Sequence, residues 1–191
     1  ENAAAISTIV TSKMVRRICD VNDIHFDETF TGFKFMAEKL AEYQRDGSYQ
    51  YVLAFEESYG YMMGDYVRDK DAVTACVMIT EMAAYYFEQG MTLAQALDAL
   101  YEKYGFYGER TLNLVMPGLD GLEKMRALMA QLRREPLQEI AGTKVVRMRD
   151  YQDGSVYVMG LGKMDKTSIS GSNVLLSLIH ISEPTRHLRI S

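Results

Sequence analysis

The sequence has no tryptophan, three prolines, three histidines and only two cysteines in 191 residues. No run approaches the roughly 20 apolar residues that a membrane-spanning helix needs, and the first residues lack the charged-then-apolar pattern of a secretory signal. Cys19 and Cys76 lie in apolar helical patterns without a His or Cys partner at metal-ligand spacing. We therefore expect reduced core thiols in a cytoplasmic protein, with no disulfide, zinc site or membrane contact.

Basic residues do not outnumber acidic ones, and the formal net charge at pH 7 is therefore -5. A nucleic-acid-binding domain usually presents a basic face to the phosphate backbone. Nucleic acid is therefore not an expected partner, and a small substrate fits better. What the chain does have is 48% hydrophobic residues, which is ample at this length for one full domain and part of another.

Strand and helix signals alternate at the start of the chain. A β-branched run over residues 6–11 predicts a buried strand, and Ser12 is a candidate N-cap for the helix that follows. Further strands are expected at 24–26 and 51–55. The helix between them starts after Thr31 or Gly32 and carries an apolar stripe, made of Phe33, Met36, Leu40 and Tyr43. This order predicts an α/β domain with a mixed, largely parallel sheet flanked by helices.

Two more helices complete this first domain, which we place at residues 1–105. A long helix over residues 71–88 is expected to end at Gly90 and to bury one face, made of Val73, Cys76, Val77, Thr80, Ala84 and Phe87. Thr92 and Gln95 then form a capping-box pattern for a helix that reaches Tyr104.

A second unit of α+β type is expected at residues 106–175. A strand signal at 111–115 precedes a helical stripe from Leu122 to Leu132, and strands at 144–149 and 155–159 flank the Asp153-Gly154 turn. The unit stops without the closing elements that a compact domain needs. We therefore expect it to be incomplete and to expose apolar surface.

Residues 176–191 differ from what precedes them, because they continue neither a strand alternation nor a helical stripe. Residues 176–186 also resemble the translation of a transposon-end adapter used to prepare sequencing libraries. We interpret 176–191 as a non-native tail, and we leave His180 and His187 out of the search for a site. Since the first residue is not methionine either, we expect both ends to be cuts in a longer reading frame.

Ligands of parallel sheets bind at the carboxyl ends of the strands, where two loops are candidates. Glu56 and Ser58 follow the third strand, and a carboxylate and a hydroxyl two residues apart on an extended loop could hold adjacent hydroxyls of one sugar ring. The second loop contains Thr31 and Gly32 and leads to Lys34. From the residues alone, an ordinary solvated turn is the favoured alternative for the segment after the third strand.

Basic residues near these loops are candidates for a phosphate site. Arg68 and Lys70 lie at the start of the long helix, whose N-terminus favours an anion, and Lys34 lies at the start of the preceding one. The alternative is that Asp69 and Asp71 cap the helix while both cations sit in solvent.

The sequence contains no recognisable nucleophilic triad and no carboxylate set with metal spacing. His25 is the one histidine that remains informative. Because it lies beside a short strand, we expect it to be structural rather than catalytic.

Taken together, three segments resemble the third domain of the α-D-phosphohexomutases, in the branch of bacterial phosphoglucomutases and phosphomannomutases. The order and spacing of the segments match, and the resemblance runs from the first strand to about Leu175. It implies that residues 1–105 are the sugar-binding domain without its first helix, and that residues 106–175 open the fourth domain. The three segments are Thr31-Gly32-Phe33-Lys34-Phe35, Phe55-Glu56-Glu57-Ser58-Tyr59-Gly60 and Arg68-Asp69-Lys70-Asp71.

The resemblance also implies roles for individual residues. Glu56 and Ser58 would contact the sugar hydroxyls. Thr31 and Gly32 would line a loop that senses the orientation of the sugar. Lys70 would assist phosphate binding, together with Arg68.

Family members carry a phosphoserine loop, an aspartate-rich Mg²⁺ loop and a terminal phosphate loop, none of which we find in this sequence. The implied reaction passes a phosphoryl group from the phosphoserine to a hexose phosphate, lets the bisphosphate turn round, and returns the other phosphate to the serine. The implied cofactors are Mg²⁺, bound by an absent domain, and glucose 1,6-bisphosphate as intermediate. The implied partners are a hexose phosphate and the missing domains of the parent chain.

We therefore expect a phosphoglucomutase fragment that supplies sugar recognition and is inactive alone. A phosphomannomutase is one alternative, because a Glu-x-Ser loop does not read the 2-hydroxyl. The other is a non-catalytic module that binds sugar phosphates.

Overall fold

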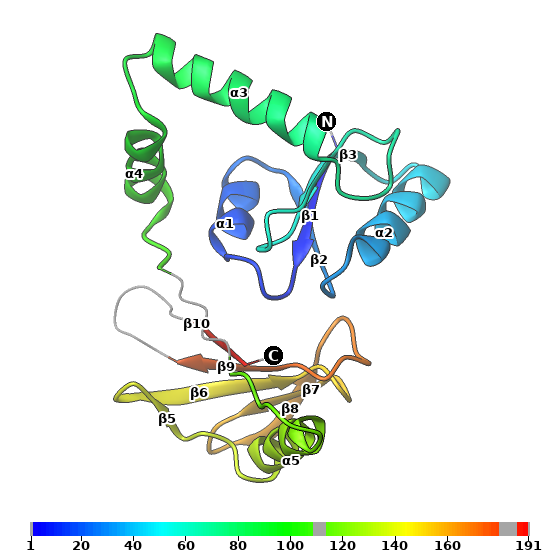
Figure 1. The fold of residues 1–191 in the computed structure, drawn as a ribbon, viewed down its shortest axis with the longest axis vertical. Helices are drawn as coiled ribbons and strands as arrows, with labels where there is room; N and C mark the ends of the chain where they lie inside the picture. The colour runs from blue at the N-terminus through cyan, green and yellow to red at the C-terminus, as the bar shows by residue number, and fades with distance from the viewer. Residues whose placement is uncertain (1, 109–113, 180–186, 191) are drawn as a thin grey trace. The chain divides into compact units, whose positions relative to one another are not determined.

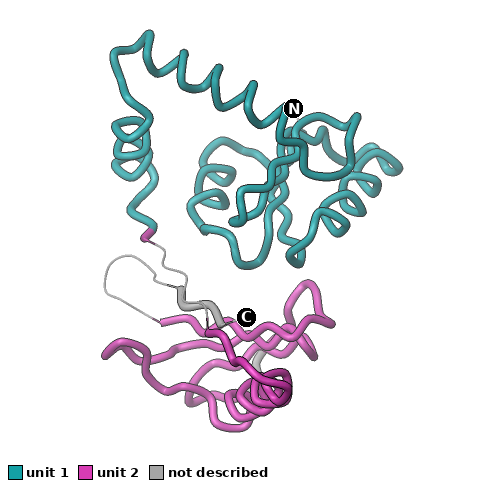
Figure 2. Tube along the Cα trace, viewed as in Figure 1, with its two compact units in different colours: residues 1–107 teal, residues 108–191 magenta. Residues whose placement is uncertain are grey.

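A computed structural model describes residues 2–108, 114–179 and 187–190. The chain forms two compact units, Glu1–Tyr107 and Gly108–Ser191 (Figure 2), and the expected boundary was between residues 105 and 106. Within these described ranges, no helix is long and apolar enough to cross a membrane. Both candidate loops lie in the first unit.

The first unit contains a four-stranded sheet in which β1 (Ala3–Thr8) is an interior strand. Its neighbours β2 (His25–Thr29) and β3 (Gln50–Phe55) both run parallel to it, whereas β4 (Tyr61–Met63) pairs antiparallel with β3, so that the order is β2-β1-β3-β4. The predicted mixed, largely parallel sheet is confirmed.

The position of β1 differs from the prediction, since it occupies residues 3–8 rather than 6–11. Thr8 pairs with Thr29, the last residue of β2. The Thr11 N–H then donates to the Thr8 carbonyl over 3.1 Å, which turns the chain away from the sheet. The β-branched run therefore continues past the strand into a turn.

Helices α1 (Met14–Val21) and α2 (Phe33–Asp46) lie on opposite sides of the strands (Figure 1). Cys19 of α1 is buried, as expected, and burial raises the pKa of its thiol. The predicted stripe of α2 is confirmed, because it forms one apolar core with residues of β1, β3 and β4. This core consists of Phe33, Met36, Leu40 and Tyr43 with Ala4, Ile6, Ala54 and Met62.

Two helices end the first unit, α3 (Ala72–Glu88) and α4 (Leu93–Tyr104). The Asp71 side chain caps α3 by accepting hydrogen bonds from the Val73 and Thr74 N–H groups. The capping box predicted for α4, between Thr92 and Gln95, is confirmed.

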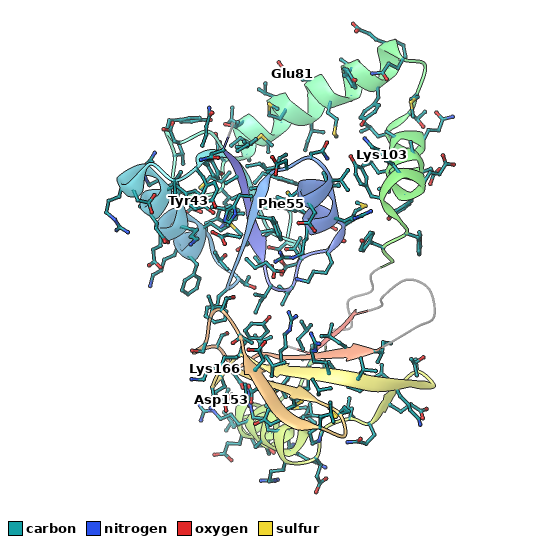
Figure 3. All side chains as sticks on the ribbon, turned by 180° about the vertical axis from the view of Figure 1, so that it is seen from behind. Tyr43, Phe55, Glu81, Lys103, Asp153 and Lys166 are labelled. Atoms are coloured by element: carbon teal, nitrogen blue, oxygen red, sulfur yellow. The ribbon has the colours of Figure 1, made fainter. Side chains whose placement is uncertain are left out.

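The inward face predicted for α3 is wrong. Val73 and Phe87 are 74% and 80% exposed, and Cys76 is exposed rather than a core thiol, whereas Ala75 is buried. The reason is that α3 is apolar on nearly every side, so that helical spacing selects no single face. In Figure 3, side chains project from opposite sides of α3 around Glu81. Val77, Thr80 and Ala84, also predicted to be buried, are exposed.

The second unit packs α5 (Gly121–Arg134) against an antiparallel sheet. Met129 of α5 forms its core with Met148 and Leu175. The strand order is β10-β9-β6-β7-β8, with β5 paired to β6. The strands are β5 (Glu139–Ile140), β6 (Thr143–Asp150), β7 (Ser155–Val158), β8 (Gly162–Lys166), β9 (Leu175–Ile179) and β10 (His187–Ile190).

The predicted helix of this unit and its two strands around the Asp153-Gly154 turn are confirmed by α5, β6 and β7. Most of the strand expected at 111–115 lies outside the described residues, and residues 114 and 115 are not in a strand.

The start of the expected tail is not irregular, because residues 175–179 form β9 between β6 and β10. Leu176 and Ile179 are buried there, whereas Val115 and Leu161 of the same unit are 83% and 69% exposed, and the incompleteness of the unit stays a prediction. An apolar run of this kind can pair with any unpaired strand edge. The pairing therefore does not decide whether these residues are native, and the non-native tail stays a prediction.

Candidate functional site

Three parallel strands bring their carboxyl ends to one edge of the first sheet. The segments that follow β1, β2 and β3 are residues 9–13, 30–32 and 56–60. Both loops chosen from the sequence lie at this edge, and Phe55, labelled in Figure 3, marks the end of β3 there. The segment 9–13 joins them, although sequence reasoning did not single it out.

The Glu56 carboxylate connects the two candidate loops. Its Oε1 accepts a hydrogen bond from the Gly32 N–H, and its Oε2 accepts one from the Ser58 hydroxyl over 3.2 Å. The Glu56 and Ser58 side chains are therefore hydrogen-bonded to each other, and their role in binding a sugar stays a prediction. Glu56 is only 9% exposed and Ser58 is exposed, so the hydroxyl is the solvent-facing part of the pair.

The local geometry that brings this pair together is a turn, not the extended loop that was expected. The Glu56 N–H donates to the Gly60 carbonyl over 2.9 Å and closes the turn. Tyr59 takes a left-handed backbone conformation, with φ of 64°, which is uncommon for a residue with a side chain. The turn returns Ser58 to the side on which Glu56 lies.

Gly60 allows the turn to approach the start of α2. A Cβ atom at this position would lie 2.5 Å from Cε2 of Phe33, closer than side chains tolerate. The same position is 3.7 Å from Cβ of Lys70, and the Lys70 ammonium lies 5.7 Å from the centroid of the Phe33 ring. Lys70 therefore adjoins the loop that carries Glu56.

The remaining predicted residues are placed differently. Thr31 is exposed next to Gly32, and the ammonium of Lys34 lies 5.6 Å from the centroid of the Phe35 ring in the first turn of α2. The Arg68 guanidinium donates to the side chain of Gln44 over 2.6 Å. Since Gln44 is near the C-terminal end of α2, the structure does not bring Arg68 to the Glu56 loop.

Lys13 from the segment after β1 and Arg16 of α1 hold a carboxylate of β2 at this edge. Lys13 is ion-paired with Glu28, and Nη2 of Arg16 lies 2.7 Å from Oε2 of the same carboxylate. Lys13 also donates to the Ile9 carbonyl over 3.0 Å. Burial disfavours the ionised form of Glu28, but the two cations outweigh burial and hold the pKa of Glu28 below its ordinary value.

His25 belongs to a cluster at the other end of β2. Its Nε2 lies 3.3 Å from Oδ2 of Asp27, and its ring stacks on Tyr49 with 3.9 Å between the centroids. Asp27 also accepts from the Tyr43 hydroxyl over 2.6 Å and pairs with Lys39. Burial opposes ionisation of Asp27, yet these partners lower its pKa, while burial and the Asp27 carboxylate raise the pKa of Tyr43. These contacts hold the His25 ring between Asp27 and Tyr49, and its structural role stays a prediction.

Sequence reasoning missed a set of hydroxyls beside the turn. Thr8 and Thr11 donate hydrogen bonds to Oε2 of Glu57 over 2.9 and 3.2 Å, and Ser7 donates to the Phe55 carbonyl over 2.9 Å. The signal that could have found them is the unusual number of hydroxyls in residues 7–12, which we had interpreted through their β-branching.

No three His, Cys, Asp or Glu side chains gather as a metal site would require in the part of the chain that the structure describes. The described residues therefore do not fit a Mg²⁺ site.

Comparisons with known proteins give one consistent result. The family model for the alpha/beta/alpha domain III of phosphoglucomutase/phosphomannomutase matches residues 1–104. A phosphoglucomutase from Staphylococcus saprophyticus is 31% identical over 170 residues, which are 89% of this chain and 31% of that protein. A phosphoglucomutase from Staphylococcus aureus is 34% identical over 170 residues, covering 89% of this chain and 30% of that protein.

Among solved structures, the chain resembles the open form of the exocytosis-sensitive phosphoprotein parafusin, a phosphoglucomutase from Paramecium. The TM-score is 0.50 at 21% identity, over 92% of this chain and 30% of that one. At this identity the likeness shows the fold alone. The chain thus spans only 30 to 31% of the length of these relatives.

The Glu28 ion pairs predict how stability depends on pH. Because the pKa of Glu28 is lower in the folded chain, its carboxylate stabilises the fold above its ordinary pKa of 4.5, and this contribution is lost as pH falls through the lower folded-state value. We expect Glu28→Gln to lower the free energy of unfolding by about 1–2 kcal/mol at pH 7, a value reduced by the exposure of Arg16. The loss should be smaller at pH 3.

Urea unfolding at pH 7 and pH 3 measures both values. Glu102→Gln, which changes an exposed glutamate of α4, is the matched control and should leave stability unchanged at each pH. An equal loss for Glu28→Gln at both pH values would contradict the assignment.

Proposed function

Because this chain belongs to the phosphoglucomutase/phosphomannomutase family, we propose that it is the sugar-recognition part of a phosphoglucomutase. The parent enzyme interconverts glucose 1-phosphate and glucose 6-phosphate. It is an intramolecular phosphotransferase, in which a phosphoserine and glucose 1,6-bisphosphate carry the phosphoryl group. The free cysteines fit a reducing cytoplasm.

The observation that carries the proposal is the pairing of Glu56 with Ser58 beside Gly32. Each oxygen of the Glu56 carboxylate has a second lone pair for a sugar hydroxyl, and a charged acceptor makes the stronger hydrogen bonds. The exposed Ser58 hydroxyl can bond the neighbouring hydroxyl of the same ring. The pair thus suits the adjacent 3- and 4-hydroxyls of glucose.

This choice of hydroxyls also suits a reaction that needs two orientations of one sugar. When the bisphosphate turns round, the 3- and 4-hydroxyls exchange places, so one carboxylate and one hydroxyl can bind both poses. The backbone of Gly32, tied to Glu56, lies where it can respond to the orientation, and Thr31 is next to it.

Phosphate binding is assigned chiefly to Lys70, which adjoins the turn. Lys34 is exposed in the first turn of α2, where the helix dipole also favours an anion. Arg68 would have to leave Gln44 in order to take part.

The other components of the reaction are assigned to further domains of a longer protein. These are the phosphoserine, the Mg²⁺ site and the terminal phosphate loop. Two observations support such partners: the chain covers only 30 to 31% of its relatives, and α3 exposes large apolar side chains of the kind that pack against other surfaces.

From the proposed contacts of Glu56 and Ser58 with the sugar, we predict which hexose phosphates bind. We expect Glu56→Gln to weaken glucose 1-phosphate binding by about tenfold, because the charged acceptor is lost, and Ser58→Ala to weaken it less. Galactose 1-phosphate, with its 4-hydroxyl inverted, should bind more weakly than glucose 1-phosphate. Mannose 1-phosphate should bind about as well, because this loop does not read the 2-hydroxyl.

Amide chemical shifts recorded during titration with each sugar phosphate give these affinities. Glu102→Gln on α4 is the control and should bind like the wild type. Equal affinities for glucose 1-phosphate and galactose 1-phosphate, or an unchanged affinity in Glu56→Gln, would remove the carbohydrate assignment.

The chain should have no mutase activity by itself, because it contributes sugar contacts but no phosphoryl donor. A coupled assay that detects glucose 6-phosphate formed from glucose 1-phosphate, with added glucose 1,6-bisphosphate and Mg²⁺, measures this directly. Turnover by the purified 191-residue chain above a no-protein blank would refute the proposal that this chain contributes only the sugar contacts.

A further inference from the structure

Glu57 lies between the two proposed sugar ligands but points to a different partner. Its Oε2 accepts hydrogen bonds from the hydroxyls of Thr8 and Thr11 over 2.9 and 3.2 Å. The two hydroxyl oxygens are themselves 2.8 Å apart. The three oxygens thus form a triangle between the turn after β3 and the turn after β1.

The two hydroxyls of this triangle are held in place by the fold. Thr8 is 1% exposed as the last residue of β1, and Thr11 is also buried. The Val10 N–H donates to the Thr8 hydroxyl over 3.3 Å. Thr8 is the last residue of β1, and β1 is paired with β2 on one side and with β3 on the other. Its side chain is therefore a rigid point of attachment.

The triangle extends the pairing of two strands beyond their ends. The last partners of β1 and β3 are Ser7 and Phe55, where the Ser7 hydroxyl donates to the Phe55 carbonyl. Past this point the backbones of β1 and β3 no longer pair, and hydrogen bonds from Thr8 and Thr11 to Glu57 connect the two segments instead. The turn is therefore fastened to β1 on one side, while Glu56 reaches Gly32 on the other.

We propose that Glu57 is a positioning residue for the sugar loop, with Thr8 and Thr11 as its anchors. Its carboxylate fixes the direction of the turn, so that Glu56 and Ser58 face the second loop before a ligand arrives. The role in sugar binding rests on the proposed function, whereas the role in ordering the turn does not. Fixing a loop in its bound geometry improves affinity because less conformational entropy is lost on binding.

Hydrogen-bond chemistry separates this role from that of a merely solvated glutamate. An ionised carboxylate accepts from both threonine hydroxyls, and the amide oxygen of glutamine can still accept from them. Alanine can accept from neither. A positioning role is therefore lost in Glu57→Ala and largely restored in Glu57→Gln.

Two measurements test the proposal on the full chain. Titration with glucose 1-phosphate gives the dissociation constant, and hydrogen exchange of the Glu56 amide, which bonds to the Gly60 carbonyl, reports order in the turn without any sugar. We expect Glu57→Ala to raise the dissociation constant and the exchange rate by about tenfold each. Exchange of the Leu40 amide, in the core of the same unit, should stay unchanged.

The threonines provide a second set of variants. Thr8→Val with Thr11→Val should cause most of the effect of Glu57→Ala, and adding Glu57→Ala to that pair should change less than it does in the wild-type chain, because the contacts to the threonines are already lost. Thr11→Val alone, which keeps the Thr8 anchor, should give an intermediate effect and serves if the double variant unfolds. Glu102→Ala on α4 is the control and should match the wild type.

Three results would each overturn the positioning role. The first is a Glu56 amide that exchanges in Glu57→Ala as slowly as in the wild type, and the second is an equal acceleration of exchange at the Leu40 amide. The third is that the effects of the threonine and Glu57 substitutions add. If the wild-type chain binds no hexose phosphate, the proposed function fails, and the exchange data alone support or overturn the ordering of the turn by Glu57.

Discussion

The candidate site depends on one buried carboxylate. Glu56 accepts from the backbone of Gly32 and from the Ser58 hydroxyl, and so joins two loops that are separated in the sequence by α2 and β3. This is possible because β1, β2 and β3 run parallel and end at one edge. It also requires that the turn lie close to α2, which the absence of a side chain at Gly60 permits above the Phe33 ring.

Much of the fold could be predicted because its signals are local. The α2 stripe of Phe33, Met36, Leu40 and Tyr43 has a clear helical period and is buried as a unit. The prediction failed where the local pattern does not indicate which face of an element is buried. In α3 nearly every side is apolar, so Val73 and Phe87 were assigned to a core that they do not join. Strand β9 was missed because its pairing with β6 depends on an edge that only the folded sheet presents.

The site was predicted from residue chemistry and spacing, which can anticipate contacts between side chains that are close in the chain. Glu56 and Ser58 are two residues apart and do meet. Arg68 was grouped with Lys70 on the same ground, yet it turns to Gln44, since a long side chain can reach in several directions. Thr8, Thr11 and Glu57 were missed because their contact joins distant segments. Only the register of β1 against β3 reveals it.

The contact between Glu56 and Gly32 can be measured most directly through the Gly32 amide. In a hydrogen bond to a carboxylate, its proton should resonate downfield and exchange slowly in the wild-type chain, and both effects should disappear in Glu56→Ala while the Leu40 amide stays as it was. A Gly32 amide with the same chemical shift and the same exchange rate in both proteins would contradict the account, because the two loops would then meet without this carboxylate.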